Sequence, residues 1–149
     1  MPDSTHDTAT LNDLIATTFD SVEGYTEAAK NSGSERFIAL FNARTVERKA
    51  VIATLRTEVT RLGGKPEDDG TMMGSAHRVF LNLKAAVTGR DEQAIIAEVE
   101  QGEDHIKAKY EQAMADTELS PAVIHMIRDC FTSIKQGHDQ MRDLKLAMK

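Results

Sequence analysis

Four polar residues interrupt the apolar stripes that helical periodicity predicts for this chain. Arg44 and Arg48 fall in the middle of one stripe, Glu103 in a second and His138 in a third. Inside a helix bundle a charge is costly unless it is paired or bound to a metal. Carboxylates and imidazoles that project inward from facing helices bind iron, manganese or zinc, whereas arginine is the preferred partner of a buried carboxylate.

The two chemistries lead to two hypotheses about this polar centre. In the first, Arg48, with Arg44 as a second candidate, pairs with Glu103 and hydrogen-bonds to His138. In the second, Glu47, Glu103 and His138 bind iron, manganese or zinc. The two arginines on one helix would repel a cation, so we favour the buried polar network and expect no cofactor.

The elements that must position these residues are four long helices. Apolar residues at helical spacing predict helices over residues 10–30, 34–62, 91–115 and from 120 to the end of the chain. Thr10 and Ser34 are candidate N-caps, and Pro121 suits a first helical turn. Gly63 and Gly64 end the second helix. The sequence has no strand-like alternation, so we predict an all-α fold.

The links between the helices predict their topology. The first and last turns are short, whereas residues 63–90 form one long connection. This is typical of a four-helix bundle with a crossover, and residues 75–87 predict a short extra helix within it. His77 and Arg78 begin this extra helix and could form a ligand pocket or a partner surface, although a capping or packing role is the simpler interpretation.

Composition limits the classes of protein to which the chain can belong. Its 149 residues and 40% hydrophobic content suit a single domain, which we expect over residues 10–149 after a disordered segment 1–9. A net charge of −6 opposes nucleic-acid binding. The sequence lacks an apolar run long enough to span a membrane, and a single cysteine and the absence of a signal-like start favour the cytoplasm. Ile38 and Ile52 suggest apolar edges on which the chain could form a homo-oligomer.

Several stretches resemble a known group of proteins. They are LNDLIATTFDSVEGYTEAA, GGKPEDDGTMMGSAHR, QGEDHIKAKYEQAM and GHDQMRDL, and together they are similar to ferritin-like four-helix-bundle proteins of unknown function, found mainly in proteobacteria. The resemblance implies a ferritin-like fold with a crossover and a role in stress physiology. The family has no established activity.

Ferritin-like di-iron proteins carry a Glu on the first helix, Glu-x-x-His on the second, Glu on the third and Glu-x-x-His on the fourth. Glu103 and His138 resemble the third-helix and fourth-helix ligands. However, Ala50 stands where the second-helix His is needed, and Lys135 where the fourth-helix Glu is needed. We therefore expect a non-catalytic binding or structural protein. The alternative is a degenerate di-iron or mononuclear bundle with a redox or metal-handling activity.

Overall fold

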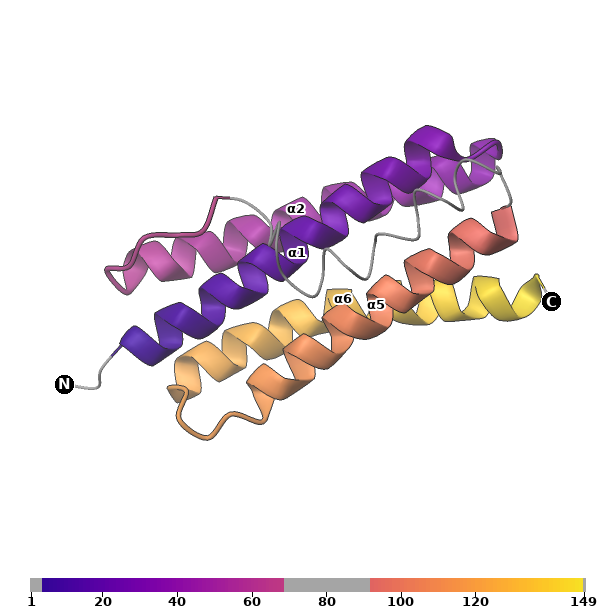
Figure 1. Cartoon of the computed structure of the whole chain (residues 1–149). Coiled ribbons are helices and arrows are strands. Elements are labelled where there is room, and N and C mark those ends of the chain that lie inside the picture. Colours follow the sequence, from indigo (N-terminus) through magenta and orange to yellow (C-terminus); the bar gives the residue numbers. More distant parts are fainter. Residues whose placement is uncertain (1–3, 69–91, 149) are drawn as a thin grey trace.

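Four long helices make up the described part of the chain, residues 4–68 and 92–148 of a computed structural model. They are α1 (Thr5–Asn31), α2 (Glu35–Arg61), α5 (Glu92–Met114) and α6 (Pro121–Ala147). They pack side by side, α1 with α2 and α5 with α6 (Figure 1). These residues contain no strand, so the all-α prediction is confirmed. None of the four helices is long and apolar enough to cross a membrane.

Local signals determine most of the helix ends. The Ser34 hydroxyl accepts a hydrogen bond from the Phe37 N–H and so caps α2. Gly63 has a φ of 86°, a conformation that favours glycine, just after α2 ends. Pro121 occupies the first turn of α6, where its missing N–H leaves no helical hydrogen bond unmade.

The first helix begins earlier than the sequence predicted. We expected residues 1–9 to be disordered and Thr10 to cap the helix, but α1 begins at Thr5 with Ser4 at the N-cap position. The reason is tertiary: the buried Asp7 carboxylate accepts a hydrogen bond from the Ser120 N–H at 3.0 Å. His6 Nε2 lies 2.7 Å from an Asp116 carboxylate oxygen. The turn between α5 and α6 thus stabilises a helical start that propensity alone does not indicate.

The helix directions follow from contacts at their ends. The Asn12 side chain donates to the Lys65 carbonyl, which places the end of α2 beside the first half of α1. The Ser32 hydroxyl donates to Glu92 at 2.8 Å, so α5 begins beside the end of α1. Both α2 and α5 therefore run opposite to α1 and parallel to each other. The predicted helix 75–87 between them lies outside the described residues.

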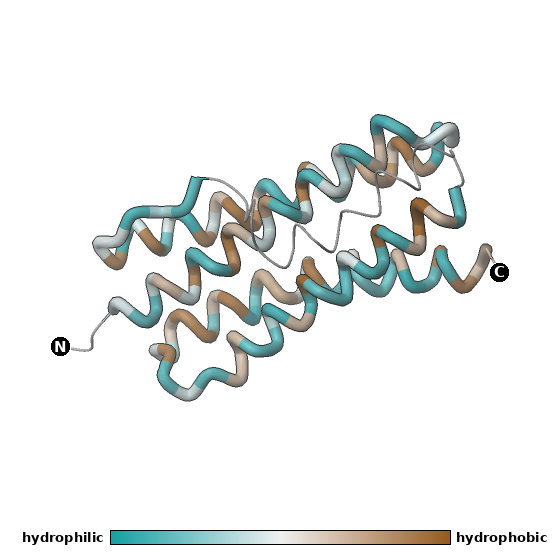
Figure 2. Tube along the Cα trace, in the orientation of Figure 1, coloured by the Kyte–Doolittle hydropathy of each residue, from teal (hydrophilic) through white to brown (hydrophobic). Residues whose placement is uncertain are grey.

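The core consists of two apolar clusters separated by a polar layer. Figure 2 shows apolar segments on all four helices with hydrophilic residues between them. The members of the first cluster that lie nearest the polar layer in sequence are Ile15, Val51, Ile106 and Ile134. On the other side of the layer the second cluster begins, with Tyr25, Phe41, Val99 and Met141. The stripes are thus interrupted at one level on all four helices.

The two isoleucines on which we based a homo-oligomer do not form an apolar edge. Ile52 is buried in the first cluster with 5% of its surface exposed, and Ile38 packs against the second cluster. That argument for self-association was wrong, because both side chains pack against the apolar clusters of the chain itself. Homo-oligomer formation itself stays a prediction.

Candidate functional site

An arginine–glutamate ion pair occupies the polar layer between the two clusters. Arg48 Nη2 on α2 donates to Glu103 Oε2 on α5 at 2.7 Å. The exposed fractions of the two side chains are 0% and 2%, so water does not screen the interaction. A buried ion pair stabilises a fold only if hydrogen bonds also satisfy its remaining polar atoms.

Helix α1 supplies the additional hydrogen bonds. The Tyr25 hydroxyl donates to Glu103 Oε1 at 2.8 Å, so both carboxylate oxygens are satisfied. Arg48 Nη1 donates to the Ser21 hydroxyl at 2.8 Å, and its guanidinium carbon lies 5.6 Å from the centre of the Tyr25 ring, a cation–π contact. The buried Arg48 Nε has no partner among the described residues. Three helices are therefore joined through one ion pair, the central pair of this structure.

The electrostatics keep Arg48 charged and Tyr25 neutral. Burial lowers the pKa of Arg48, but the charge and hydrogen bond of Glu103 more than offset this, so the pKa is raised. Burial and the neighbouring Glu103 charge hold the pKa of Tyr25 well above its usual value. Tyr25 thus remains a neutral donor to the carboxylate.

A second tyrosine extends the polar layer toward the first cluster. The Thr18 hydroxyl lies 2.8 Å from the Tyr110 hydroxyl and 2.6 Å from the Leu14 carbonyl. Because Thr18 has one proton and the carbonyl can only accept, Tyr110 donates to Thr18. Burial raises the pKa of Tyr110, so this phenol also stays neutral.

Arg44 belongs to a separate network between α2 and α6. Its guanidinium donates to Glu47 at 2.7 Å and to the Gln140 side chain at 2.6 Å, and the Ser133 hydroxyl donates to Glu47. Gly137 lies where the two arginines approach α6, because a Cβ atom there would lie 2.4 Å from Arg48 Nη2. Glu47 is therefore directed away from the central pair.

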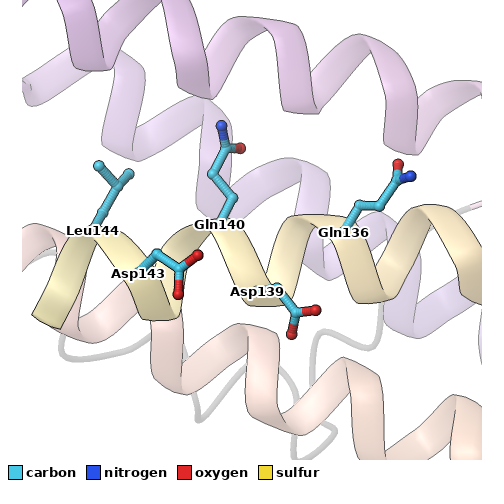
Figure 3. Close-up of a pocket in the computed structure, with 5 residues that line it drawn as sticks. All are labelled: Gln136, Asp139, Gln140, Asp143 and Leu144. Carbon is cyan, nitrogen blue, oxygen red and sulfur yellow. The ribbon is translucent and has the colours of Figure 1, made fainter.

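His138 also has partners other than the central pair. Its Nε2 lies 2.6 Å from an Asp104 oxygen on α5, and its Nδ1 lies 3.1 Å from an oxygen of Asp139. Figure 3 shows Asp139 and Gln140 projecting from opposite sides of α6, around a shallow surface pocket. The α5 side and the α2 side of this helix thus carry different polar networks.

The structure separates the three metal ligands that one hypothesis joined. Glu103 pairs with Arg48, Glu47 with Arg44, and His138 with Asp104. A di-iron centre does not fit these residues, because the guanidinium of Arg48 occupies the space that a metal bound to Glu103 would need. The other predicted site residues, His77 and Arg78, lie outside the described residues.

Sequence reasoning missed several members of these networks. Ser21 is a small polar residue that does not interrupt a stripe, and the helical angle of Asp104 places it on the solvent side of its helix. Asp20 on α1 is also buried, with 2% of its surface exposed. Its helical angle places it opposite the apolar stripe that contains Leu14 and Tyr25, so periodicity gives no signal of this burial.

A family assignment covers most of the chain. Residues 7–116 match a family described as a domain of unknown function, DUF2383. The chain belongs to this family. The comparison with curated proteins finds no match.

The DUF2383 match coincides with part of the polar layer. Ser21, Tyr25, Arg48 and Glu103 lie within it, whereas His138 and the rest of α6 follow its end. The complete central pair with its hydrogen-bond partners is thus contained in the family's domain. The predicted resemblance to proteins of unknown function is confirmed at this coarser level.

Proposed function

We propose that this chain is a ferritin-like four-helix bundle with a long crossover from α2 to α5, acting as a non-catalytic binding or structural protein. The crossover is supported by the parallel directions of α2 and α5, since a link between two consecutive parallel helices must return along the bundle. The cytoplasmic location and the role in stress physiology stay predictions.

The observation that carries this proposal is the central pair. Glu103 is directed at the bundle interior from α5, as a third-helix ligand of a di-iron protein would be, yet Arg48 and Tyr25 satisfy both of its oxygens. The side chains of Arg48 and Glu103 are 0% and 2% exposed, so a substrate could not reach them without opening the bundle. The pair joins α1, α2 and α5, which favours a structural role.

Metal analysis tests the proposal. The iron and manganese contents of tag-free protein should be the same for the wild type, Glu103→Gln and the control Glu111→Gln, which changes an exposed residue of α5. A stoichiometric metal that is lost in Glu103→Gln and kept in Glu111→Gln would contradict it. The alternative metal-handling function would then be correct, with its ion at the centre.

A further inference from the structure

A cluster of metal-ligating groups lies on the face between α5 and α6, away from the central pair. Glu100 and Asp104 are four residues apart on α5 and so project from one side of it, toward His138 on α6. One ligand atom from each of the three lies within 4.8 Å of the others. The exposed side-chain fractions of Glu100, Asp104 and His138 are 13%, 56% and 9%, so the imidazole is fixed while Asp104 faces solvent.

A further carboxylate, that of Asp139, orients the His138 ring from the edge opposite Asp104. Asp139 lies 3.1 Å from Nδ1, on the other edge of the ring from the Asp104 oxygen, which lies 2.6 Å from Nε2. A neutral imidazole has only one N–H and can donate to only one of these carboxylates. When Nδ1 donates to Asp139, the lone pair of Nε2 is directed toward α5 and is available to a metal ion. Carboxylate–histidine–metal arrangements use this geometry to orient the ligand.

Among the described residues, the two carboxylates of the cluster have fewer cationic partners than Asp139 has. Lys145 lies 3.4 Å from Glu100, and Lys135 and Arg142 lie 2.9 Å and 3.3 Å from Asp139. The ion pairs of Asp104 within the described residues involve only His138. Glu100 and Asp104 thus present two negative charges against the one charge of Lys145, whose side chain is 40% exposed and can move aside.

We propose that Glu100, Asp104 and His138 bind one divalent transition-metal ion of the zinc type, with water completing the coordination. One imidazole and two carboxylates are ligands that such ions accept. With metal–ligand distances of about 2.0–2.2 Å, the ligand atoms of a tetrahedral site lie about 3.3 Å apart. The contact from Asp104 to His138 therefore has to open, which rotation of the exposed Asp104 side chain allows. The site is independent of the central pair and goes beyond the proposed function.

A second histidine cluster provides a control within the same chain. His6, Asp116 and Glu118 also lie within 4.8 Å of one another, but His6 is 43% exposed and Glu118 is 78% exposed. The His6 Nε2 to Glu118 distance is 3.9 Å. We expect this more exposed set to bind the ion weakly, because more side-chain freedom must be lost on binding.

Zinc titration of the tag-free full chain by calorimetry tests the site, with magnesium as a comparison ion. The wild type should bind one zinc ion at the high-affinity site and should prefer it to magnesium. His138→Gln and Asp104→Asn should each weaken binding by about tenfold or more, and Asp139→Asn by about 10-fold to 100-fold through misorientation of the ring. His6→Gln and Glu103→Gln should leave the affinity unchanged. Zinc should raise the melting temperature of the wild type but not that of His138→Gln.

Two sets of results would overturn the proposal. The first is zinc binding by the wild type no tighter than by Asp104→Asn, a variant of an exposed residue that leaves the core intact. The second is loss of binding in His6→Gln, which would assign the ion to the other cluster. Loss of zinc binding in Glu103→Gln alone would instead contradict the proposed function, so the failures of the two proposals are distinguishable.

Discussion

The substitution Glu103→Ala removes the carboxylate and leaves Arg48 charged in the core. Arg48 has no exposed surface, so the guanidinium cannot reach water in place of its partner. Breaking a buried pair by removing one member costs about 3–5 kcal/mol. The Tyr25 hydroxyl also loses its acceptor, but the same rearrangement can relieve both groups, so the two effects do not add. A domain of this kind has a free energy of unfolding of about 5–15 kcal/mol, so we expect the loss to be a large fraction of it.

Urea unfolding followed by circular dichroism measures this loss. Glu111→Ala on α5 is the matched control, and it should change the free energy of unfolding by less than about 0.5 kcal/mol because Glu111 is exposed. The double variant Arg48→Met/Glu103→Leu should recover most of the stability, since a buried pair can be replaced by apolar residues of similar volume. A loss below about 1 kcal/mol in Glu103→Ala would refute the reasoning, because it would mean that Arg48 reaches solvent or another partner.

Three further perturbations test other parts of the structure. Gly137→Ala should lower the free energy of unfolding by about 1–3 kcal/mol, because the new Cβ would lie 2.4 Å from Arg48 Nη2. This cost should exceed the gain from the higher helix propensity of alanine. A variant that is more stable than the wild type in urea unfolding would contradict this. The hydrogen bond to Asp116 raises the pKa of His6. The contact therefore stabilises the fold fully below about pH 6.5, the pKa of an unfolded His, and this stabilisation is lost as the pH rises through the raised pKa of His6. The melting temperature of the wild type should therefore exceed that of His6→Gln more at about pH 5.5 than at about pH 9, and equal differences would argue against the contact. Burial raises the pKa of Cys130 to about 11, so alkylation by iodoacetamide at about pH 8 should be slow in native protein and fast in urea, and similar rates would show an accessible thiol.

The positions of the polar residues could be predicted from the sequence, but most of their partners could not. Arg48 and Glu103 are surrounded at helical spacing by apolar residues, so periodicity alone indicates that they are buried. Arg48 was paired with Glu103 from the sequence, whereas the contacts of Arg44 with Gln140 and of His138 with Asp104 depend on how the helices are rotated against one another. The sequence does not determine this rotation, because several residues on each helix could face the neighbour.

The ends and edges of the helices were harder to predict for the same reason. The helical start at Thr5 depends on Asp7 and His6 meeting the turn between α5 and α6, a contact more than 100 residues away in the chain. Asp104 is exposed, as its helical angle predicts, yet its side chain reaches across to His138. Helical angles describe where a Cα–Cβ bond points, whereas a side chain can extend over a neighbouring helix.

The claim that Arg48 replaces a metal at the centre of the bundle is tested most directly by a crystal structure. Crystals would be soaked in iron or zinc and data collected at the absorption edge of the metal. The structure predicts density for a guanidinium within hydrogen-bond distance of Glu103 and no anomalous peak there, whether or not an ion binds beside His138. An anomalous peak within about 2.2 Å of a Glu103 oxygen, with Arg48 displaced, would contradict it.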